Sequence, residues 1–217
     1  MKSLLLKVYY KILDINSYVK YLFQIIYYKL NYKRANPSLN LENINKVVFV
    51  AHPDDEILFF SRQLLNDSKI LVVCMTNGGN WIRQKEFIEL MKAIRLQFKI
   101  LNFRDGTNAK WNSKKIKREI SKIINLKNHW EMIITHNKEG EYGHTQHKLL
   151  NKYVEEVCKG KNIYTSSTSE YIECKENALS LMEKNRKIEF MKKYYKSQDN
   201  SSKYIMKYYD YEGIIKC

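Results

Sequence analysis

Short apolar runs alternate with stretches of helical periodicity along most of the chain. The runs predict buried strands over residues 47–51, 70–75, 99–103, 132–135 and 163–166. Between them, apolar residues recur every three or four positions, which is the spacing of an amphipathic helix. This spacing predicts helices that begin near Asp55, extend over 82–98, cover 116–124 and 149–157, and resume from about Glu176.

Strands that are apolar throughout and alternate with helices are typical of a parallel sheet covered on both faces. With right-handed crossovers, the prediction is an α/β fold: a Rossmann-like, doubly wound, mainly parallel sheet. No G-x-G-x-x-G follows the first predicted strand, so dinucleotide binding does not follow from the fold class. His52, Thr76 and His136 come at or just after strand ends. They therefore lie at the carboxyl edge of the sheet, where such folds bind ligands.

The segment Ala35-Asn36-Pro37-Ser38-Leu39-Asn40 divides the sequence into a basic amphipathic helical arm, residues 1–40, and a domain over 41–217. Lysines interrupt the apolar stretches of the arm, and none approaches the ~20 apolar residues of a membrane-spanning helix. No small-residue cleavage site follows, which argues against a cleaved signal peptide. Two interpretations stay open: the arm lies in a membrane interface, or it packs on the domain.

Composition adds a strong positive charge, because 38 Lys and Arg against 23 Asp and Glu give +15. Part of this basicity reflects a bias toward Lys, Asn, Ile and Tyr across the whole chain. The remainder favours an anionic partner, either a phosphorylated substrate or an anionic membrane surface. Nucleic acid is disfavoured, because the sequence has no zinc-finger spacing or RNA-binding aromatic signature. Four cysteines without a C-x-x-C pair indicate a cytoplasmic protein, with peripheral contact to the inner face of the membrane as an option.

Two short segments carry most of the candidate chemistry: Ala51-His52-Pro53-Asp54-Asp55-Glu56 after the first strand, and Gly143-His144-Thr145-Gln146-His147 far along the chain. His52 and Asp55 are three residues apart across a strand-to-helix turn that Pro53 stiffens. His147 is the candidate third ligand. Two histidines and one carboxylate leave coordination positions for water, as in catalytic zinc sites, and the same set suits Fe²⁺.

Asp54 and His144 are spare groups beside these ligands. Asp54 is the predicted general base, because a metal lowers the pKa of water from about 16 toward 7 and a carboxylate then suffices. His144, as an imidazolium, would stabilise an oxyanion or protonate a leaving amine. A simpler interpretation is that Asp54 or Asp55 only caps the next helix. The combination favours a metal site, because both segments fall at one sheet edge in a chain with five histidines.

These residues resemble the PIG-L (LmbE-like) family of zinc-dependent N-deacetylases, which includes GlcNAc-phosphatidylinositol de-N-acetylases. The resemblance covers about residues 45–200. It rests on Ala-His-Pro-Asp-Asp-Glu at 51–56, Thr-His-Asn at 135–137 and Gly-Glu-Tyr-Gly-His-x-x-His at 140–147. It also takes in Thr76-Asn77-Gly78 and Arg83-x-x-Glu86.

The resemblance implies a role for each matching position. It assigns His52, Asp55 and His147 to zinc. It makes Asp54 the general base, His144 the oxyanion-stabilising or acid group, and Tyr142 a mobile tyrosine that also reaches the oxyanion. It implies substrate contacts by Arg83, Thr76 and Asn77. His136 also matches a family position, and for it support behind the ligands and a direct role both stay open.

One departure from the family pattern is Gln146, where many members carry a carboxylate. If this side chain lies near His144, the missing charge would make His144 easier to deprotonate. The prediction is therefore a zinc-dependent hydrolase that removes acetyl from an N-acetylglucosamine-type conjugate, anionic and either nucleotide- or lipid-linked. Two alternatives stay open: an amidase acting on a non-sugar N-acyl substrate, and a catalytically silent membrane- or glycan-binding module.

Overall fold

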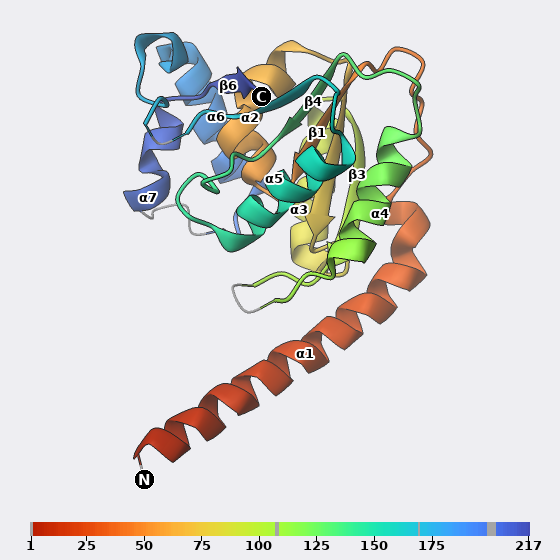
Figure 1. The fold of residues 1–217 in the computed structure, drawn as a ribbon, viewed down its shortest axis with the longest axis vertical. Coiled ribbons are helices and arrows are strands. Elements are labelled where there is room, and N and C mark those ends of the chain that lie inside the picture. Colours follow the sequence, from red (N-terminus) through yellow and green to blue (C-terminus); the bar gives the residue numbers. More distant parts are fainter. Residues whose placement is uncertain (1, 107–108, 169, 199–202) are drawn as a thin grey trace.

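A six-stranded sheet forms the centre of the computed structural model, which describes residues 2–106, 109–168, 170–198 and 203–217 (Figure 1). The strands are β1 (Lys46–Val50), β2 (Ile70–Thr76), β3 (Gln97–Phe103), β4 (Met132–Thr135), β5 (Ile163–Ser166) and β6 (Ile214–Lys216). Their order is β3-β2-β1-β4-β5-β6, and only the β5–β6 pair is antiparallel. The chain thus builds outward from β1 to β3 and then crosses to β4, which confirms the doubly wound prediction.

Helices cover both faces of the sheet. On one face lie α2 (Asp55–Asn66), α3 (Trp81–Ala93) and α6 (Leu181–Tyr194), and on the other lie α4 (Ser113–Ile124) and α5 (Thr145–Val157). The remaining helices are α1 (Lys2–Ala35), α7 (Lys203–Met206) and the 3₁₀ turns η1 (Lys175–Asn177) and η2 (Lys207–Tyr209). In β1, Val48 and Val50 join one core while Val47 and Phe49 join the other. Burial on both faces explains why the strands read as uninterrupted apolar runs.

The predicted helix over 82–98 is wrong at its C-terminal end, because α3 stops at Ala93 and β3 begins at Gln97. Arg95 adopts a left-handed conformation with φ of 59°, and the Leu96 N–H donates back to the Met91 carbonyl at 3.0 Å. Helix ends of this kind usually carry glycine at the left-handed position. With arginine there, the sequence contained no signal for the end of the helix.

The C-terminal half of α1 packs on the edge strand β3 and on the loop after β2. The Tyr28 hydroxyl donates to the Ile100 carbonyl at 2.8 Å. A Cβ atom on Gly79 would lie 2.1 Å from the carbonyl oxygen of Gln24, so only glycine fits beneath the helix. Figure 1 shows the N-terminal half of α1 extending away from the sheet. Whether residues 1–40 act as a separate unit stays a prediction.

Candidate metal centre

The candidate site lies at the carboxyl edge of the sheet, where β1 and β4 are neighbours and the strand order reverses. Open α/β sheets bind ligands at this switch point. His52 and Asp55 lie in the turn from β1 to α2, His136 directly follows β4, and His147 lies in the first turn of α5. All four side chains are buried.

The turn from β1 to α2 sends its two aspartates in different directions. The His52 N–H donates to Asp55 Oδ2 at 2.7 Å, which fixes Asp55 toward the histidines. Asp54 has φ of 107°, a conformation rare for any residue but glycine. Glu56 Oε2 accepts the Asp54 N–H at 3.1 Å and so supports this backbone.

Three donor atoms converge beside this turn: His52 Nδ1, Asp55 Oδ2 and His147 Nε2. The distances are 3.2 Å from His52 to Asp55, 3.2 Å from His52 to His147 and 3.3 Å from Asp55 to His147. A tetrahedron with bonds of about 2.0 Å, the usual zinc–nitrogen and zinc–oxygen length, has edges of about 3.3 Å. The three atoms therefore have the spacing of one face of a tetrahedral metal site.

The second nitrogen of each histidine faces a hydrogen-bond acceptor. His147 Nδ1 lies 2.7 Å from Glu141 Oε2. His52 Nε2 lies 2.7 Å from Gln146 Oε1 and 3.2 Å from Asp105 Oδ1. With a proton on each of these two outer nitrogens, the ring nitrogen within the triangle would be free to bind a metal. Acceptors behind metal-binding histidines orient the ring in this way.

The charges around the triangle also fit a cation. The Asp55 carboxylate oxygen lies 3.2–3.3 Å from both ring nitrogens, and a positive charge at this position, which a bound cation would supply, stabilises it. Burial would raise the pKa of Asp55, but the imidazoles of His147 and His52 outweigh it and hold that pKa well below its usual value. Asp55 is thus ionised, and the residues fit a divalent metal.

Glu141 and Asp105 are the two residues of this site that the sequence analysis did not single out. Glu141 also receives the Ser166 hydroxyl, and it lies 3.1 Å from Nδ1 of His136. Burial acts against its charge, but His136 and His147 hold the pKa of Glu141 well below its usual value. Glu141 stands inside the quoted Gly-Glu-Tyr-Gly-His segment, and Asp105 follows the third strand. These two positions in the sequence were the features from which Glu141 and Asp105 could have been recognised as site residues.

His136 lies against the ligands rather than among them. Its ring stacks on that of His147 with centroids 3.8 Å apart. Two further groups of side chains lie close enough together to hold a metal ion: His136 with Asp55 and His147, and His144 with His52 and His147. The Nε2 of His136, however, accepts the Ala51 N–H at 3.0 Å, so the lone pair of that nitrogen is already used. This contact favours a supporting role for His136 over a direct one, and the role stays a prediction.

Asp54 and Arg83 form a pair at the opening of the turn. Arg83 Nη2 lies 3.2 Å from Asp54 Oδ1 and also donates to the Pro53 carbonyl. Burial raises the pKa of Asp54 to about 6, although Arg83 acts in the opposite direction. Among the described residues, the buried Nη1 of Arg83 has no hydrogen-bond partner. A substrate oxygen would satisfy it.

His144 and Tyr142 lie on another side of the triangle. The His144 ring centroid is 4.7 Å from that of His52 and 4.4 Å from that of His147. Burial, together with the charges of His147 and His52, lowers the pKa of His144 to about 4. The ring is therefore neutral near pH 7, whereas an imidazolium was expected. Tyr142 is 40% exposed, and its ring lies 5.8 Å from that of His144.

The other predicted residues lie around the turn. Gln146 contacts His52 instead of His144, so the expected effect of its missing charge does not act through direct contact. Thr76 is fully buried and donates its hydroxyl to the Ala51 carbonyl at 2.8 Å, which supports the turn. Asn77 donates to Asp105 Oδ2 at 2.7 Å. Direct contact of Thr76 or Asn77 with a substrate stays a prediction.

The fold is a doubly wound sheet, and two histidines and one carboxylate converge at its switch point. These features place the chain among the α/β proteins with a candidate catalytic metal site. Within that class, the sequence model of the PIG-L family, described as GlcNAc-PI de-N-acetylase, matches residues 47–158. The chain belongs to this family.

Individual relatives have modest sequence identity to this chain. An uncharacterized protein of Acanthamoeba polyphaga mimivirus is 34% identical over 138 residues, covering 56% of this chain and 60% of the relative. A probable N-acetylglucosaminyl-phosphatidylinositol de-N-acetylase of Dictyostelium discoideum is 28% identical over 132 residues, covering 54% and 51%. The chain thus spans little more than half the length of these curated relatives. The N,N'-diacetylchitobiose deacetylase of Pyrococcus horikoshii shares the fold, with a TM-score of 0.56 at 17% identity over 82% of this chain and 80% of that one.

Proposed function

We propose that the chain is a metal-dependent hydrolase that removes the acetyl group from an N-acetylglucosamine-type sugar conjugate. The observation that carries the proposal is the triangle of His52, Asp55 and His147, with ligand-like spacing of 3.2–3.3 Å, beside the carboxylate of Asp54. Membership of the PIG-L family supports the reaction class.

His52, Asp55 and His147 would hold the metal, for which we propose zinc, although Fe²⁺ accepts the same ligand types. When bound, a divalent metal supplies Lewis-acid chemistry and lowers the pKa of water from about 16 toward 7. Arg83 lies 3.2 Å from Asp54 and holds that carboxylate in place. Asp54 then accepts a proton from the attacking water. A raised carboxylate pKa suits a base that must exchange protons near neutral pH.

His144 and Tyr142 act on the acyl oxygen in this proposal. A neutral imidazole and a phenol both donate hydrogen bonds, which stabilise the negative charge that develops on that oxygen. As the C–N bond breaks, the proton taken by Asp54 passes to the departing nitrogen. Water is thereby consumed, acetate and a free amine leave, and Asp54 returns to its ionised form.

The net charge of +15 favours a substrate that carries phosphate, as a nucleotide conjugate or a lipid-linked glycan precursor. Arg83 is suited to such a group, because its planar fork matches phosphate and sugar oxygens. The test is acetate release from free, nucleotide-linked and lipid-linked N-acetylglucosamine, with zinc-loaded protein and a chelated control. Metal-dependent release from one class supports the proposal and identifies that class.

The same assay separates the two alternatives. If no acetate is released from any of the three sugars but acetate is released from a non-sugar N-acetyl amide, the result would favour the amidase. Glycan binding without any acetate release would favour the silent module. The complete set of His52, Asp54, Asp55, His144 and His147 argues against that module.

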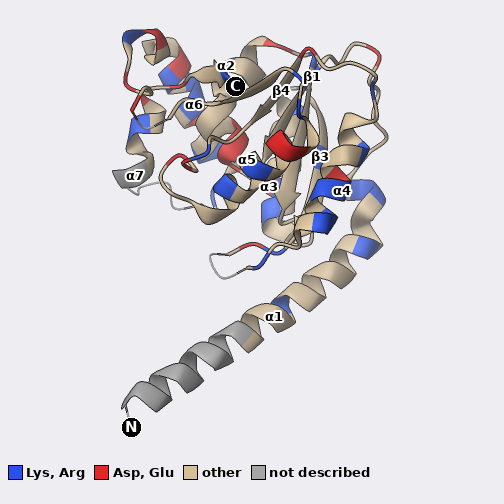
Figure 2. Cartoon of the chain, viewed as in Figure 1, with Lys and Arg blue, Asp and Glu red and all other residues tan. Residues whose placement is uncertain are grey.

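The helix α1 supports a second part of the proposal, peripheral contact with an anionic membrane. Its side turned away from β3 carries exposed apolar side chains: Ile15, Tyr18, Val19, Leu22, Phe23, Ile26 and Leu30. Over residues 15–35, α1 carries Lys and Arg but no Asp or Glu, as Figure 2 shows; Asp14 directly precedes this stretch in the sequence. Within the described residues, no helix is long and apolar enough to cross a membrane. Apolar and cationic side chains on one helix suit an anionic interface.

Sedimentation with anionic vesicles tests this contact. Phe23→Glu and Ile26→Glu together should reduce the bound fraction several-fold, because they place charge on an exposed apolar face. Leu181→Glu is the control, since it changes an equally exposed apolar residue on α6. Equal binding of the two variants and the unaltered chain would reject the membrane contact and leave the catalytic proposal standing.

A further inference from the structure

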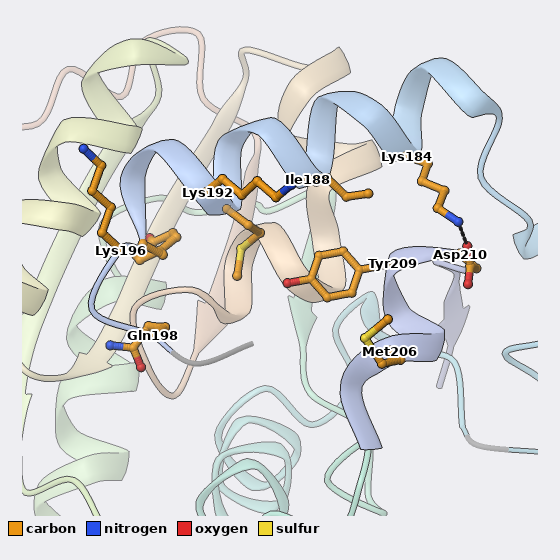
Figure 3. A pocket seen from close by; sticks show the side chains of 10 residues that line it. Lys184, Ile188, Lys192, Lys196, Gln198, Met206, Tyr209 and Asp210 are labelled. Carbon is orange, nitrogen blue, oxygen red and sulfur yellow. Dashed lines mark hydrogen bonds and ion pairs between the residues drawn. The ribbon is translucent and has the colours of Figure 1, made fainter. Parts of the chain in front are cut away.

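The turn in which α6 ends, residues 195–198, lies against the domain on one side only. Lys196 and Gln198 mark this α6 turn in Figure 3. Tyr195 directly follows the helix and is 1% exposed, so its side chain is packed within the domain. On the other side the turn borders a hollow of about 650 Å³, which Tyr195, Lys196 and Gln198 help to line. The hydrogen bonds that the α6 turn makes with the domain therefore contribute strongly to its position.

The first of these bonds reaches the start of α2. The Tyr195 hydroxyl donates to Glu56 Oε1, and the other oxygen of Glu56 accepts the Asp54 N–H at 3.1 Å. Burial and the negative charge of Glu56 raise the pKa of Tyr195 well above its usual value, so the hydroxyl keeps its proton and stays a donor. Tyr195 thus fixes the carboxyl group that supports the backbone of the proposed catalytic base.

Asp54 depends on such support. Its φ of 107° is rare for a residue with a side chain, and conformations of this kind persist only where surrounding contacts hold them. Asp54 also stands at the N-cap of α2, where the helix itself offers no carbonyl to its N–H. If Glu56 moved, the turn would be free to relax, and the Asp54 carboxylate would shift relative to the triangle of ligands.

A second pair of bonds ties the same turn to α3, the helix that carries Arg83. The Ser197 N–H donates to Glu86 Oε1 at 2.8 Å, and the Ser197 hydroxyl donates to Glu86 Oε2 at 2.7 Å. Glu86 lies about one helical turn after Arg83, whose Nη2 is 3.2 Å from Asp54 Oδ1. The α6 turn therefore contacts both partners of the Asp54–Arg83 pair, through the backbone of one and the helix of the other.

We propose that Tyr195 and Ser197 are positioning residues, which hold Asp54 and Arg83 in the geometry that proton transfer requires. The inference rests on the proposed deacetylase function. A general base must lie within about 2.6–3.2 Å of the proton it accepts. A displacement of about 1 Å caused by a change far from the chemistry can lower a rate about 10²-fold. Loosening of the α6 turn should therefore reduce turnover without loss of metal.

Amide hydrogen exchange tests this link without any turnover. Tyr195→Phe removes the hydroxyl that donates to Glu56 and keeps the ring. We expect the Asp54 N–H to exchange about tenfold faster or more, because its acceptor is no longer fixed. The Val48 N–H, in the buried central strand β1, reports opening of the whole domain, and its rate should change less. Equal acceleration of both amides, or an unchanged rate at Asp54, would overturn the proposal.

Kinetics then test the effect on catalysis. Tyr194→Phe is the matched control, because it makes the same change in the adjacent residue, whose ring stacks on that of Phe190. On the conjugate that the wild type prefers, Tyr195→Phe should lower kcat about tenfold, with KM and bound zinc equal to those of the control. Ser197→Ala should lower kcat several-fold, because it removes the hydroxyl that donates to Glu86. Ser197→Thr keeps a hydroxyl and should restore the wild-type rate.

The two measurements separate failure of this link from failure of the proposed function. If Tyr195→Phe and Ser197→Ala keep the kcat of the control, or lose activity only through KM or bound zinc, the positioning role is wrong and the deacetylase stands. A rate for Ser197→Thr as low as that for Ser197→Ala would remove Ser197 from the proposal. If the wild type releases acetate from no N-acetylated compound, the deacetylase is rejected, and exchange at Asp54 still decides whether Tyr195 holds the turn.

Discussion

At the scale of single residues, the positions of protons decide what the site can bind. Glu141 and Gln146 accept from the outer nitrogens of His147 and His52 at 2.7 Å each, and so direct both lone pairs to one point. The sequence identified His52, Asp55 and His147 because they stand in short motifs. It did not identify Glu141, whose importance depends on a fold that brings it against two histidines.

Glu141→Gln tests this orientation. The amide keeps the size of the side chain but removes the charge that holds Nδ1–H of His147. We expect zinc affinity to fall about 10- to 100-fold. Competition with a chelating indicator measures it, and Glu156→Gln, a change on the exposed side of α5, serves as the control. Equal affinity in the two variants would show that Glu141 does not act through the metal ligands.

Asp54 shows a second limit of sequence analysis at this scale. Its φ of 107° follows from the tight turn between β1 and α2, and an aspartate at this position in the sequence does not predict that conformation. Strained residues of this kind persist where surrounding contacts hold them, at a cost of about 1–3 kcal/mol. Here the contacts come from Glu56 and Arg83.

At the scale of helices and strands, α1 closes the open edge of the sheet. Asn36, directly after α1, pairs with β3 as another strand would: its Oδ1 accepts the Ile100 N–H at 2.9 Å and its Nδ2 donates to the Ile100 carbonyl at 3.1 Å. Unpaired strand edges promote aggregation, so covering this edge protects the fold. Residues 21–36 therefore contribute to the domain, whatever the rest of α1 contacts.

Tyr28→Phe measures how much this packing contributes. The change removes a hydroxyl that donates to Ile100 at 2.8 Å. We expect the free energy of unfolding in urea to fall by about 1 kcal/mol. Tyr18→Phe on the same helix is the control, because Tyr18 is 52% exposed. If both variants unfold at the same urea concentration as the wild type, the contact between α1 and β3 is not stabilising.

A polar link joins α2 to α6. Arg62 Nε lies 3.0 Å from Glu183 Oε1, and Glu183 also caps the start of α6 by accepting from Ser180. The hydrogen bond from Arg62 lowers the pKa of Glu183 to about 2. Since this folded-state value lies below the unfolded value of about 4.3, the stabilisation is complete above that pH and disappears as the pH falls toward 2.

Glu183→Gln makes that pH dependence measurable. Near pH 7 the variant should be less stable by about 1 kcal/mol, a small value because the pair is partly exposed to solvent. By about pH 2 most of the difference should be lost, because about half of the wild-type side chains are then protonated. Urea unfolding at both pH values, with Glu89→Gln as the exposed control, gives the answer. A constant difference at both pH values would assign the effect to packing instead of charge.

Element boundaries were predictable where burial dictated the pattern. β1, β2, β4 and β5 read as apolar runs because both faces are buried. β6 was not predicted, because it is three residues long and pairs only with β5 at the sheet edge. The end of α3 was missed because Arg95 occupies the left-handed position without a glycine.

At the scale of the whole molecule, the site is assembled from segments that the chain order keeps far apart. The β1–α2 turn supplies His52 and Asp55, the start of α5 supplies His147, and the loop after β3 supplies Asp105. The meeting of these segments could be anticipated, because a doubly wound sheet brings the carboxyl ends of its strands to one edge.

The central claim is that Asp54 serves as the base beside a metal held by His52, Asp55 and His147. The most direct measurement is the rate of acetate release per bound zinc, for wild type and Asp54→Asn, on the N-acetylglucosamine conjugate that the wild type prefers. The account predicts equal zinc content and a rate about 10²- to 10⁴-fold lower in the variant. Equal rates at equal zinc content would contradict it.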